Sequence, residues 1–284
     1  MHAADDSTRH FPYDIIEMIT AHLADDLRTL KACSLTCRSW YSATVPHLHY
    51  VLTLNSTKPD KTLRKLKPLS KLCRLGLNPR IKEVRVSDKL GPFPWFVPHA
   101  LSPCNVRRFS TFANVQTLVL ESVHIRHFIP NVKLYFGHLS QTLRSIEVQF
   151  PKCAPRQLSH FLSLFSNLDD IKLLYAPIGL FDTDIPDVKL VPFSAPKLQG
   201  RLELYDFHWV ETCTDLVTSC GLRFHYMDLR KVGGCAPVLL EACAETLETL
   251  RFGVTERSNS KYLCGSICGF QLMSNRIWYL LVTP

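Results

Sequence analysis

Pairs of histidines and cysteines are the residues of this 284-residue chain whose types and spacing could bind a metal ion. Imidazole nitrogens and thiolates bind zinc when three or four of them converge on one ion. The candidate pairs are His47 with His49, His124 with His127, Cys33 with Cys37, and Cys264 with Cys268. Neither histidine pair has a third ligand nearby, and the sequence contains no Cys-x-x-Cys pair. We therefore predict no metal site.

Adjacent carboxylates are the second group of residues that could take part in chemistry. Asp25-Asp26 and Asp169-Asp170 could act as acid and base only if both side chains faced one site. Neighbouring side chains on a helix do not face each other, so helix caps or solvated faces are the better interpretation. The motifs of serine hydrolases, zinc proteases and glycine-rich phosphate loops do not occur in the sequence. We predict no catalytic residue and no cofactor, and so not an enzyme.

The composition is that of a globular protein, with 46% hydrophobic and 20% charged residues. The longest apolar run, Ile277–Val282, is far shorter than the roughly 20 residues of a membrane helix. Asp5 and Asp6 precede Arg9 at a terminus without the apolar core of a signal peptide. The 11 cysteines are an odd number, and without a secretory signal we expect mostly buried, reduced thiols. The expected protein is soluble and cytoplasmic or nuclear, with no membrane partner.

The net charge of +8 is concentrated in one block. Residues 51–150 contain 16 Lys/Arg and 5 Asp/Glu, and the basic residues are densest at 58–89. Leucines recur there every three residues, and Pro68 interrupts the run: Leu63, Leu66, Leu69, Leu72 and Leu75. The two interpretations are a phosphate-binding patch and the solvated face of a helix. The absence of aromatic residues from 58–89 favours the second, and we predict a basic helical linker at 51–80.

The first fifty residues are predicted to form three short helices. Pro12 suits the first turn of a helix, and the apolar stripe that follows is Ile15, Ile16, Ile19 and Leu23. Asp25 or Asp26 can cap a second helix, and Thr36 can cap a third that ends before Pro46. Three helices of this size rarely form a stable unit alone, and they carry more apolar residues than they can bury. A partner protein that covers these apolar residues would stabilise the three helices.

This segment resembles an F-box. The matching residues are Phe11, Pro12, Asp14, Ile15, Ile16, Ile19, Leu23, Leu27, Leu30, Cys33, Ser34, Leu35, Cys37, Arg38 and Trp40. Phe11 and Asp14 depart from the usual Leu and Glu but keep the chemical type. The resemblance implies binding to the Skp-family adaptor of a cullin-type ubiquitin ligase, through or supported by Pro12, Ile15, Ile16, Ile19, Leu27, Leu30, Leu35 and Trp40. The alternative is a generic helical cap with a core tryptophan.

The rest of the chain has a loose repeat of short aliphatic strands. We predict strands at Ile81–Val86, Val115–Leu120, Ser145–Phe150, Ile171–Tyr175, Arg201–Tyr205, His225–Leu229 and Thr249–Val254. Their anchors are 23 to 34 residues apart, mostly within the 20–29 residues typical of leucine-rich repeats. Stacking such units buries their apolar faces and leaves one strand face open for recognition. The alternative is a mixed α/β domain whose similar strands are accidental.

Three segments depart from this rhythm. Residues 91–104 contain four prolines and three aromatics, and there Trp95 and Phe96 are candidate substrate anchors in a binding loop or in a packed insertion. Residues 176–200 are predicted as an inter-repeat loop. The third segment is the tail after Val254, which is either a final strand or an atypical terminus.

The predicted fold class is α/β. It consists of a three-helix F-box at 8–50, the basic linker at 51–80, and an irregular leucine-rich-repeat-like α/β solenoid with a parallel sheet at 81–284. The predicted function is substrate recognition in a Skp–cullin–F-box ubiquitin ligase, with an unknown protein substrate. The alternatives are an F-box scaffold acting outside a ligase and a nucleic-acid binder that uses 58–89; nucleic acid is the less favoured partner.

Overall fold

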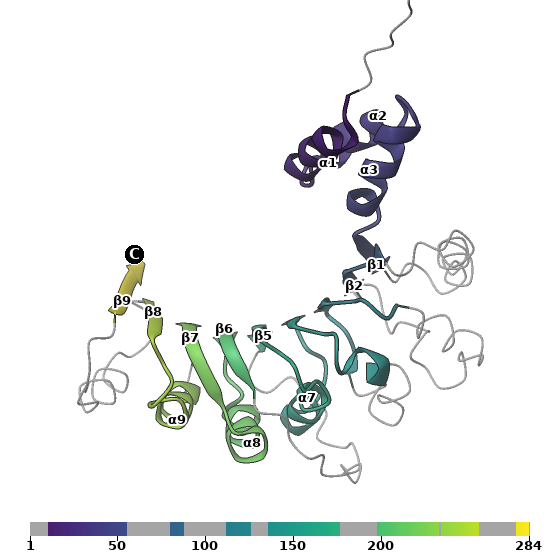
Figure 1. Ribbon diagram of the computed structural model, residues 1–284. Coiled ribbons are helices and arrows are strands. Elements are labelled where there is room, and N and C mark those ends of the chain that lie inside the picture. The colour runs from purple at the N-terminus through teal and green to yellow at the C-terminus, as the bar shows by residue number, and fades with distance from the viewer. Residues whose placement is uncertain are drawn as a thin grey trace, which may run out of the picture. The chain divides into compact units, whose positions relative to one another are not determined.

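The computed structural model describes residues 11–55, 80–87, 112–125, 136–176, 198–232, 234–255 and 277–283 (Figure 1). The chain divides into two compact units, Met1–Leu52 and Thr53–Pro284. Its class is α/β with a parallel sheet, as the sequence predicts.

The described part of the first unit contains three helices: α1 (Tyr13–His22), α2 (Leu27–Ser34) and α3 (Arg38–Leu48). α3 packs against both α1 and α2. The small core is made of Ile16, Thr20, Leu30, Ala43, Thr44 and Val45. The Thr20 and Thr44 hydroxyls are satisfied by carbonyls of their own helices, Glu17 at 3.0 Å and Trp40 at 2.9 Å.

The caps of these helices test the sequence prediction directly. Asp26, one of the two predicted candidates, caps α2: its carboxylate accepts hydrogen bonds from the backbone N–H groups of Arg28 at 3.1 Å and Thr29 at 3.0 Å. The prediction of Thr36 as the cap of α3 is wrong, because the N-cap is Cys37 and the Thr36 hydroxyl donates to the Cys33 carbonyl at 2.8 Å. The helix α3 also continues two residues past Pro46. Because Pro46 lies in the last turn, its missing backbone N–H removes a hydrogen bond only at the end of the helix.

In the described residues, nine strands form one sheet whose spatial order is the chain order, β1 to β9. They are β1 (Val51–Asn55), β2 (Glu83–Ser87), β3 (Thr117–Glu121), β4 (Ser145–Gln149), β5 (Asp170–Ala176), β6 (Gln199–Phe207), β7 (Arg223–Arg230), β8 (Thr249–Thr255) and β9 (Ile277–Thr283). Every neighbouring pair from β2 to β9 is parallel. The seven predicted strands are confirmed as β2 to β8, within two residues at each end.

The two remaining strands, β1 and β9, test the predictions for the linker and for the tail. β1 occupies residues 51–55, so the prediction of a helical linker is wrong for its first five residues; residues 56–79 lie outside the described part of the chain. β9 shows that the tail contains a final strand, because it pairs with β8 over seven residues.

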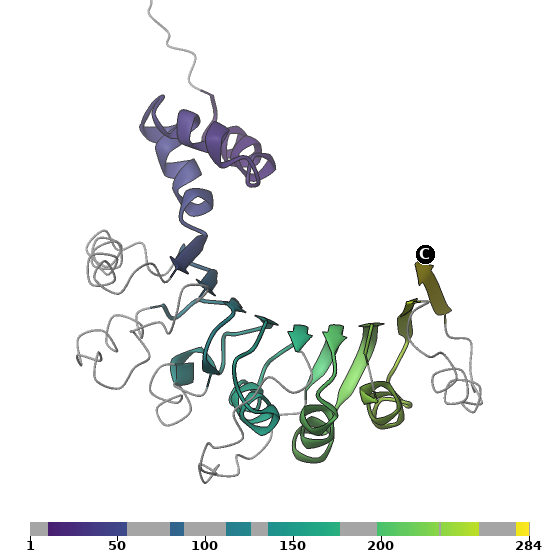
Figure 2. The same cartoon turned by 180° about the vertical axis from the view of Figure 1, so that it is seen from behind.

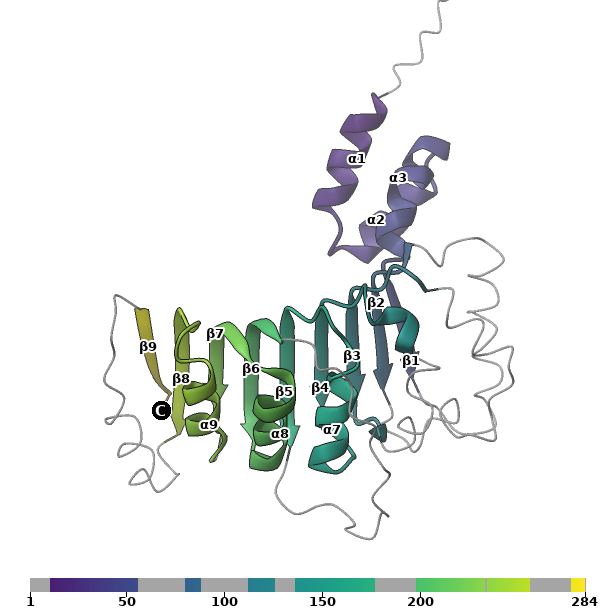
Figure 3. The ribbon, with the colours of Figure 1, turned by 60° about the horizontal axis from the view of Figure 1, so that its bottom comes forward.

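The helices of the described residues that follow the sheet strands lie on one face of this sheet. The sheet curves, and α7 (Pro155–Leu162), α8 (Val210–Cys220) and α9 (Cys235–Ala242) lie side by side on its convex face, as Figures 1 and 2 show from opposite sides and Figure 3 shows face on. A short 3-10 helix, η6 (Gly137–Leu139), lies between β3 and β4 in the chain. Alternate strand residues such as Val84, Leu118 and Ile146 are buried, and the residues between them lie on the concave face, which we call the open face.

Five consecutive strands share one unusual backbone feature at their carboxyl ends. Ser122, Phe150, Tyr175, Asp206 and Lys231 have left-handed φ angles of 55°, 47°, 57°, 52° and 52°. They occupy one aligned position, since the residues before them pair in register from β3 to β7. The residue after each one is buried: Val123, Pro151, Ala176, Phe207 and Val232. The left-handed residue therefore turns the chain from the open face into the core.

Candidate functional site

The eight residues that the F-box resemblance implicates differ in their exposure. Pro12, Ile15, Leu27 and Leu35 are exposed, Ile19 and Trp40 are partly buried, and Ile16 and Leu30 are buried. Leu35, at the carboxyl end of α2, is 86% exposed, whereas Ile16 and Leu30 are 2% and 0% exposed. Ile16 and Leu30 therefore hold the helices together, and the first four residues lie on the outer surface of the unit.

Other large apolar residues of this unit are exposed too. We define the apolar helical surface as Phe11, Tyr13, Ile15, Met18, Leu27, Leu35 and Tyr41. Met18 was missed from the sequence, although its position three residues after Ile15 places both on one side of α1. So many exposed large apolar side chains on about forty residues are typical of an interaction surface.

An exposed cysteine, Cys37, occupies the N-cap position of α3. Its side chain is exposed at the start of α3, and a hydrogen bond from the backbone N–H of Trp40 is the main cause that lowers the pKa of the thiol. The other described cysteines follow the sequence expectation more closely: Cys153, Cys213, Cys235 and Cys243 are buried, and Cys33 is partly buried. Burial raises the pKa of Cys153.

The open face of the second unit carries mainly polar side chains on β2 to β8. Because the strands pair in register, its residues form three rows that cross the sheet. The middle row runs Arg85, Val119, Glu147, Lys172, Glu203, Asp228 and Arg251. Opposite charges are neighbours from Glu147 through Lys172 to Glu203 and again at Asp228 and Arg251, whereas Glu203 and Asp228 place two carboxylates on adjacent strands.

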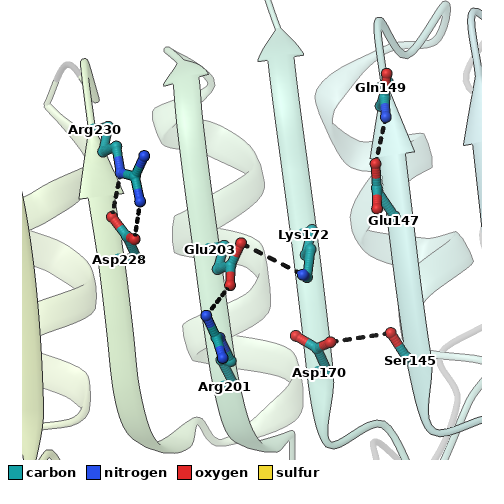
Figure 4. Close-up of polar contacts among 9 residues, drawn as sticks. All are labelled: Ser145, Glu147, Gln149, Asp170, Lys172, Arg201, Glu203, Asp228 and Arg230. Carbon is teal, nitrogen blue, oxygen red and sulfur yellow. Dashed lines mark hydrogen bonds and ion pairs between the residues drawn. The ribbon is translucent and has the colours of Figure 1, made fainter. Parts of the chain in front are cut away.

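Ion pairs and hydrogen bonds connect these side chains (Figure 4). Glu203 lies between two cations: it pairs with Arg201 on its own strand and with Lys172 on β5, whose Nζ is 3.6 Å from its Oε2. Arg230 is held by Asp228 through two hydrogen bonds, Nε to Oδ1 at 2.8 Å and Nη2 to Oδ2 at 2.5 Å. These bonds raise the pKa of Arg230, because they favour its charged form.

Aromatic rings follow the same strands toward their carboxyl ends. Phe150 and Tyr175 stack with ring centroids 4.6 Å apart, and Tyr175 meets the edge of Tyr205 at 5.1 Å. Lys231 Nζ lies 5.4 Å from the centre of the Tyr205 ring. Tyr226 packs beside two guanidinium groups, at 4.3 Å from Arg201 and 5.7 Å from Arg251.

Two hollows lie on the open face. The larger, about 440 Å³, is lined by Thr53, Arg85, Val86, Ser87, Val119, Glu121, Glu147 and Gln149. The smaller, about 280 Å³, is lined by Leu174, Tyr175, Glu203, Leu204, Tyr205, Asp228 and Arg230. Sequence reasoning missed the residues of both hollows, although their signal was present as the polar positions between strand aliphatics.

The remaining predicted sites are the aromatic loop, the basic segment, the candidate metal-binding pairs and the carboxylate pairs. Trp95, Phe96 and the basic residues 58–79 lie outside the described residues, as does His127. Within the described ranges, no three His, Cys, Asp or Glu side chains gather closely enough to hold a metal ion. Of the carboxylate pairs, Asp26 is a helix cap, and Asp170 accepts a hydrogen bond from the Ser145 hydroxyl at 3.1 Å. No helix in the described part of the chain has the length and apolar character needed to cross a bilayer.

No protein-family model matches the chain, and no similar sequence is found among curated proteins.

Proposed function

We propose that this protein is the substrate-recognition subunit of a Skp–cullin–F-box type ubiquitin ligase. The apolar helical surface would bind the Skp-family adaptor, and the open face of the sheet would hold a protein substrate. The observation that carries the proposal is the exposure of Ile15, Leu27 and Leu35, three residues that the F-box resemblance implicates, on a unit of three short helices.

The second unit supports the proposal as a leucine-rich-repeat-like solenoid. Its strands follow one another in chain order, its helices lie on the convex face, and a left-handed residue recurs at one position of five repeats. The position that carries asparagine in many leucine-rich repeats is apolar here, as at Val123, Ala176 and Val232. Such a scaffold offers a long concave surface for a protein partner.

The chain would contribute proximity rather than bond chemistry. Holding a substrate beside a ubiquitin-loaded enzyme raises the effective concentration of the reacting groups, while other subunits supply the catalytic residues. The absence of catalytic motifs from the sequence agrees with this role.

Co-purification of the full chain with a Skp-family adaptor tests the proposal. Leu35→Asp and Ile15→Asp each place a charge where the interface would exclude water, so each should abolish stoichiometric binding. Both side chains are exposed, so the helices should remain folded. Ala24→Asp, the same change at an exposed residue in the turn after α1, is the matched control and should bind like the native chain.

Two outcomes would change the conclusion. If the native chain does not bind the adaptor, the ligase role is rejected. If the native chain binds but no bound protein is ubiquitinated in the reconstituted ligase, the F-box scaffold acting outside a ligase replaces it.

A further inference from the structure

The smaller hollow of the open face has an uneven arrangement of charge. Its carboxylates are largely shielded from solvent: the side chain of Asp228 is 4% exposed and that of Glu203 is 21% exposed. The cations paired with them reach outward, since the side chains of Arg230 and Arg201 are 48% and 45% exposed. Lys231, exposed at the end of β7, adds a further cation beside the hollow. The cations are therefore more accessible to a partner from solvent than the carboxylates with which they pair.

Arg230 is fixed in place before any partner arrives. Asp228 holds its Nε and Nη2 atoms, which leaves Nη1 and the outer edge of the guanidinium to other acceptors. A pre-organised guanidinium loses little side-chain entropy on binding, so the geometry favours a carboxylate at this point.

Apolar side chains lie beside this cation, since Tyr205 pairs in register with Arg230 and Leu174 pairs with Tyr205. This apolar group consists of Leu174, Tyr175 and Tyr205, and Phe150 extends it through its stack with Tyr175. Phe150 and Tyr175 adopt the left-handed backbone, which is costly for aromatic residues and is often retained at binding sites. Exposed, rigid aromatic side chains are typical anchors of protein interfaces.

We propose that this hollow binds an acidic peptide segment, with an Asp or Glu carboxylate on Arg230 and Lys231 and a neighbouring aliphatic or aromatic side chain against Leu174 and Tyr205. The inference rests on the proposed function, for which it names the class of substrate. The hollow of about 280 Å³ is smaller than the usual pocket for a drug-sized ligand and suits a peptide side chain.

The ring contacts favour a peptide over single-stranded nucleic acid. Nucleic-acid sheets bind bases by stacking them on free aromatic faces. Here the Phe150 and Tyr175 rings stack on each other, Lys231 lies over Tyr205, and Arg201 and Arg251 lie over Tyr226.

The test is selection of a phage-displayed library of random dodecapeptides on the full chain, without any adaptor. We expect selected peptides enriched in Asp or Glu next to a large apolar residue. A labelled consensus peptide should then bind at least about tenfold more tightly, by fluorescence anisotropy, than its Asn/Gln counterpart.

Three variants locate the site. The double variant Asp228→Asn with Arg230→Gln removes the ion pair without changing the net charge or leaving a buried carboxylate, and should weaken the consensus peptide about tenfold or more. Lys231→Gln, at an exposed side chain, should weaken it by about threefold to tenfold. Arg156→Gln, the matched control on α7, should change the affinity less than about twofold.

Selection without acidic enrichment, or a consensus peptide that binds the double variant as tightly as the native chain, overturns the inference. Tighter binding of a twelve-nucleotide oligothymidine than of the peptide would assign the face to nucleic acid instead. Because no adaptor takes part, these outcomes are independent of the adaptor experiment, and either proposal can fail alone.

Discussion

The two units expose opposite kinds of surface. The helical unit leaves large apolar side chains such as Leu35 and Met18 in water, whereas the open face of the sheet carries ion pairs such as Asp228–Arg230. The difference follows from size. Three short helices have few interior positions, so many apolar residues stay outside. Stacked strands and helices cover one another, so the sheet can bury its aliphatic side chains on one face and keep the other polar. Exposed apolar surface on a small unit and paired charge on a large one point to two different partners.

The largest expected effect is in the core of the second unit. Phe161 is buried on α7 between the rings of Phe136 and Phe165, with centroids 5.6 Å and 5.3 Å away. Phe161→Ala should lower the free energy of unfolding by about 3–5 kcal/mol, since it removes the ring and leaves a cavity. Urea unfolding followed by circular dichroism measures this. A loss below about 1 kcal/mol would mean that the sheet and helices are less closely packed than described.

A matched pair of leucines on or beside α2 tests the comparison within the helical unit. Leu30→Ala should lower the free energy of unfolding by about 2–5 kcal/mol, because Leu30 is buried. Leu35→Ala should change it by less than about 0.5 kcal/mol, because Leu35 is exposed. Thermal unfolding of both variants gives the values. Equal losses would show that Leu35 is a core residue and would remove it from the apolar helical surface.

Gly200 tests how tightly neighbouring strands are joined. It has a φ of 93° at the bulge of β6 in its pairing with β7, and an added Cβ would overlap the carbonyl oxygen of Asp169, immediately before β5. That oxygen accepts the Arg201 N–H at 2.7 Å. Gly200→Ala should therefore lower the free energy of unfolding by about 1–3 kcal/mol. Ala at the exposed Gly221, which has open space around its Cβ position and φ of 58°, is the control and should cost less.

The smallest expected effect is at the cap of α2. Hydrogen bonds from Thr29, first from its hydroxyl, lower the pKa of Asp26 below its usual 3.8. Because the folded-state pKa is lowered, Asp26 stabilises the fold above pH 3.8, and this contribution is lost as the pH falls through the lowered pKa. Asp26→Ala should reduce the melting temperature slightly at pH 7. The same comparison near pH 2 should show a smaller difference; a constant difference would contradict the role of the ionised carboxylate.

Much of the fold was predictable because it depends on local pattern. Alternating aliphatics between polar residues, as in Leu143–Val148, indicate strands whatever their partners. The exposure of Ile15 and the burial of Ile16 were not predictable, because both belong to one apolar stripe and the packing of α3 decides which one is covered. The smaller hollow of the open face was equally unpredictable from the sequence, since the register of the strands brings Tyr175 beside Phe150 and Tyr205. Phe and Tyr also do not indicate a left-handed backbone.

The order of the strands has a consequence for how the chain folds during synthesis. Each strand pairs with the next strand along the chain, so aligned residues such as Val84 and Leu118, or Leu229 and Phe252, are only 34 and 23 residues apart. A ribosome adds residues one at a time, and each new strand can join a sheet edge that already exists. Among the described strands, each partner is the next one along the chain, so the separation in sequence that has to be closed at each step is small and so is its entropy cost. The sheet can therefore assemble from its amino-terminal end while translation continues.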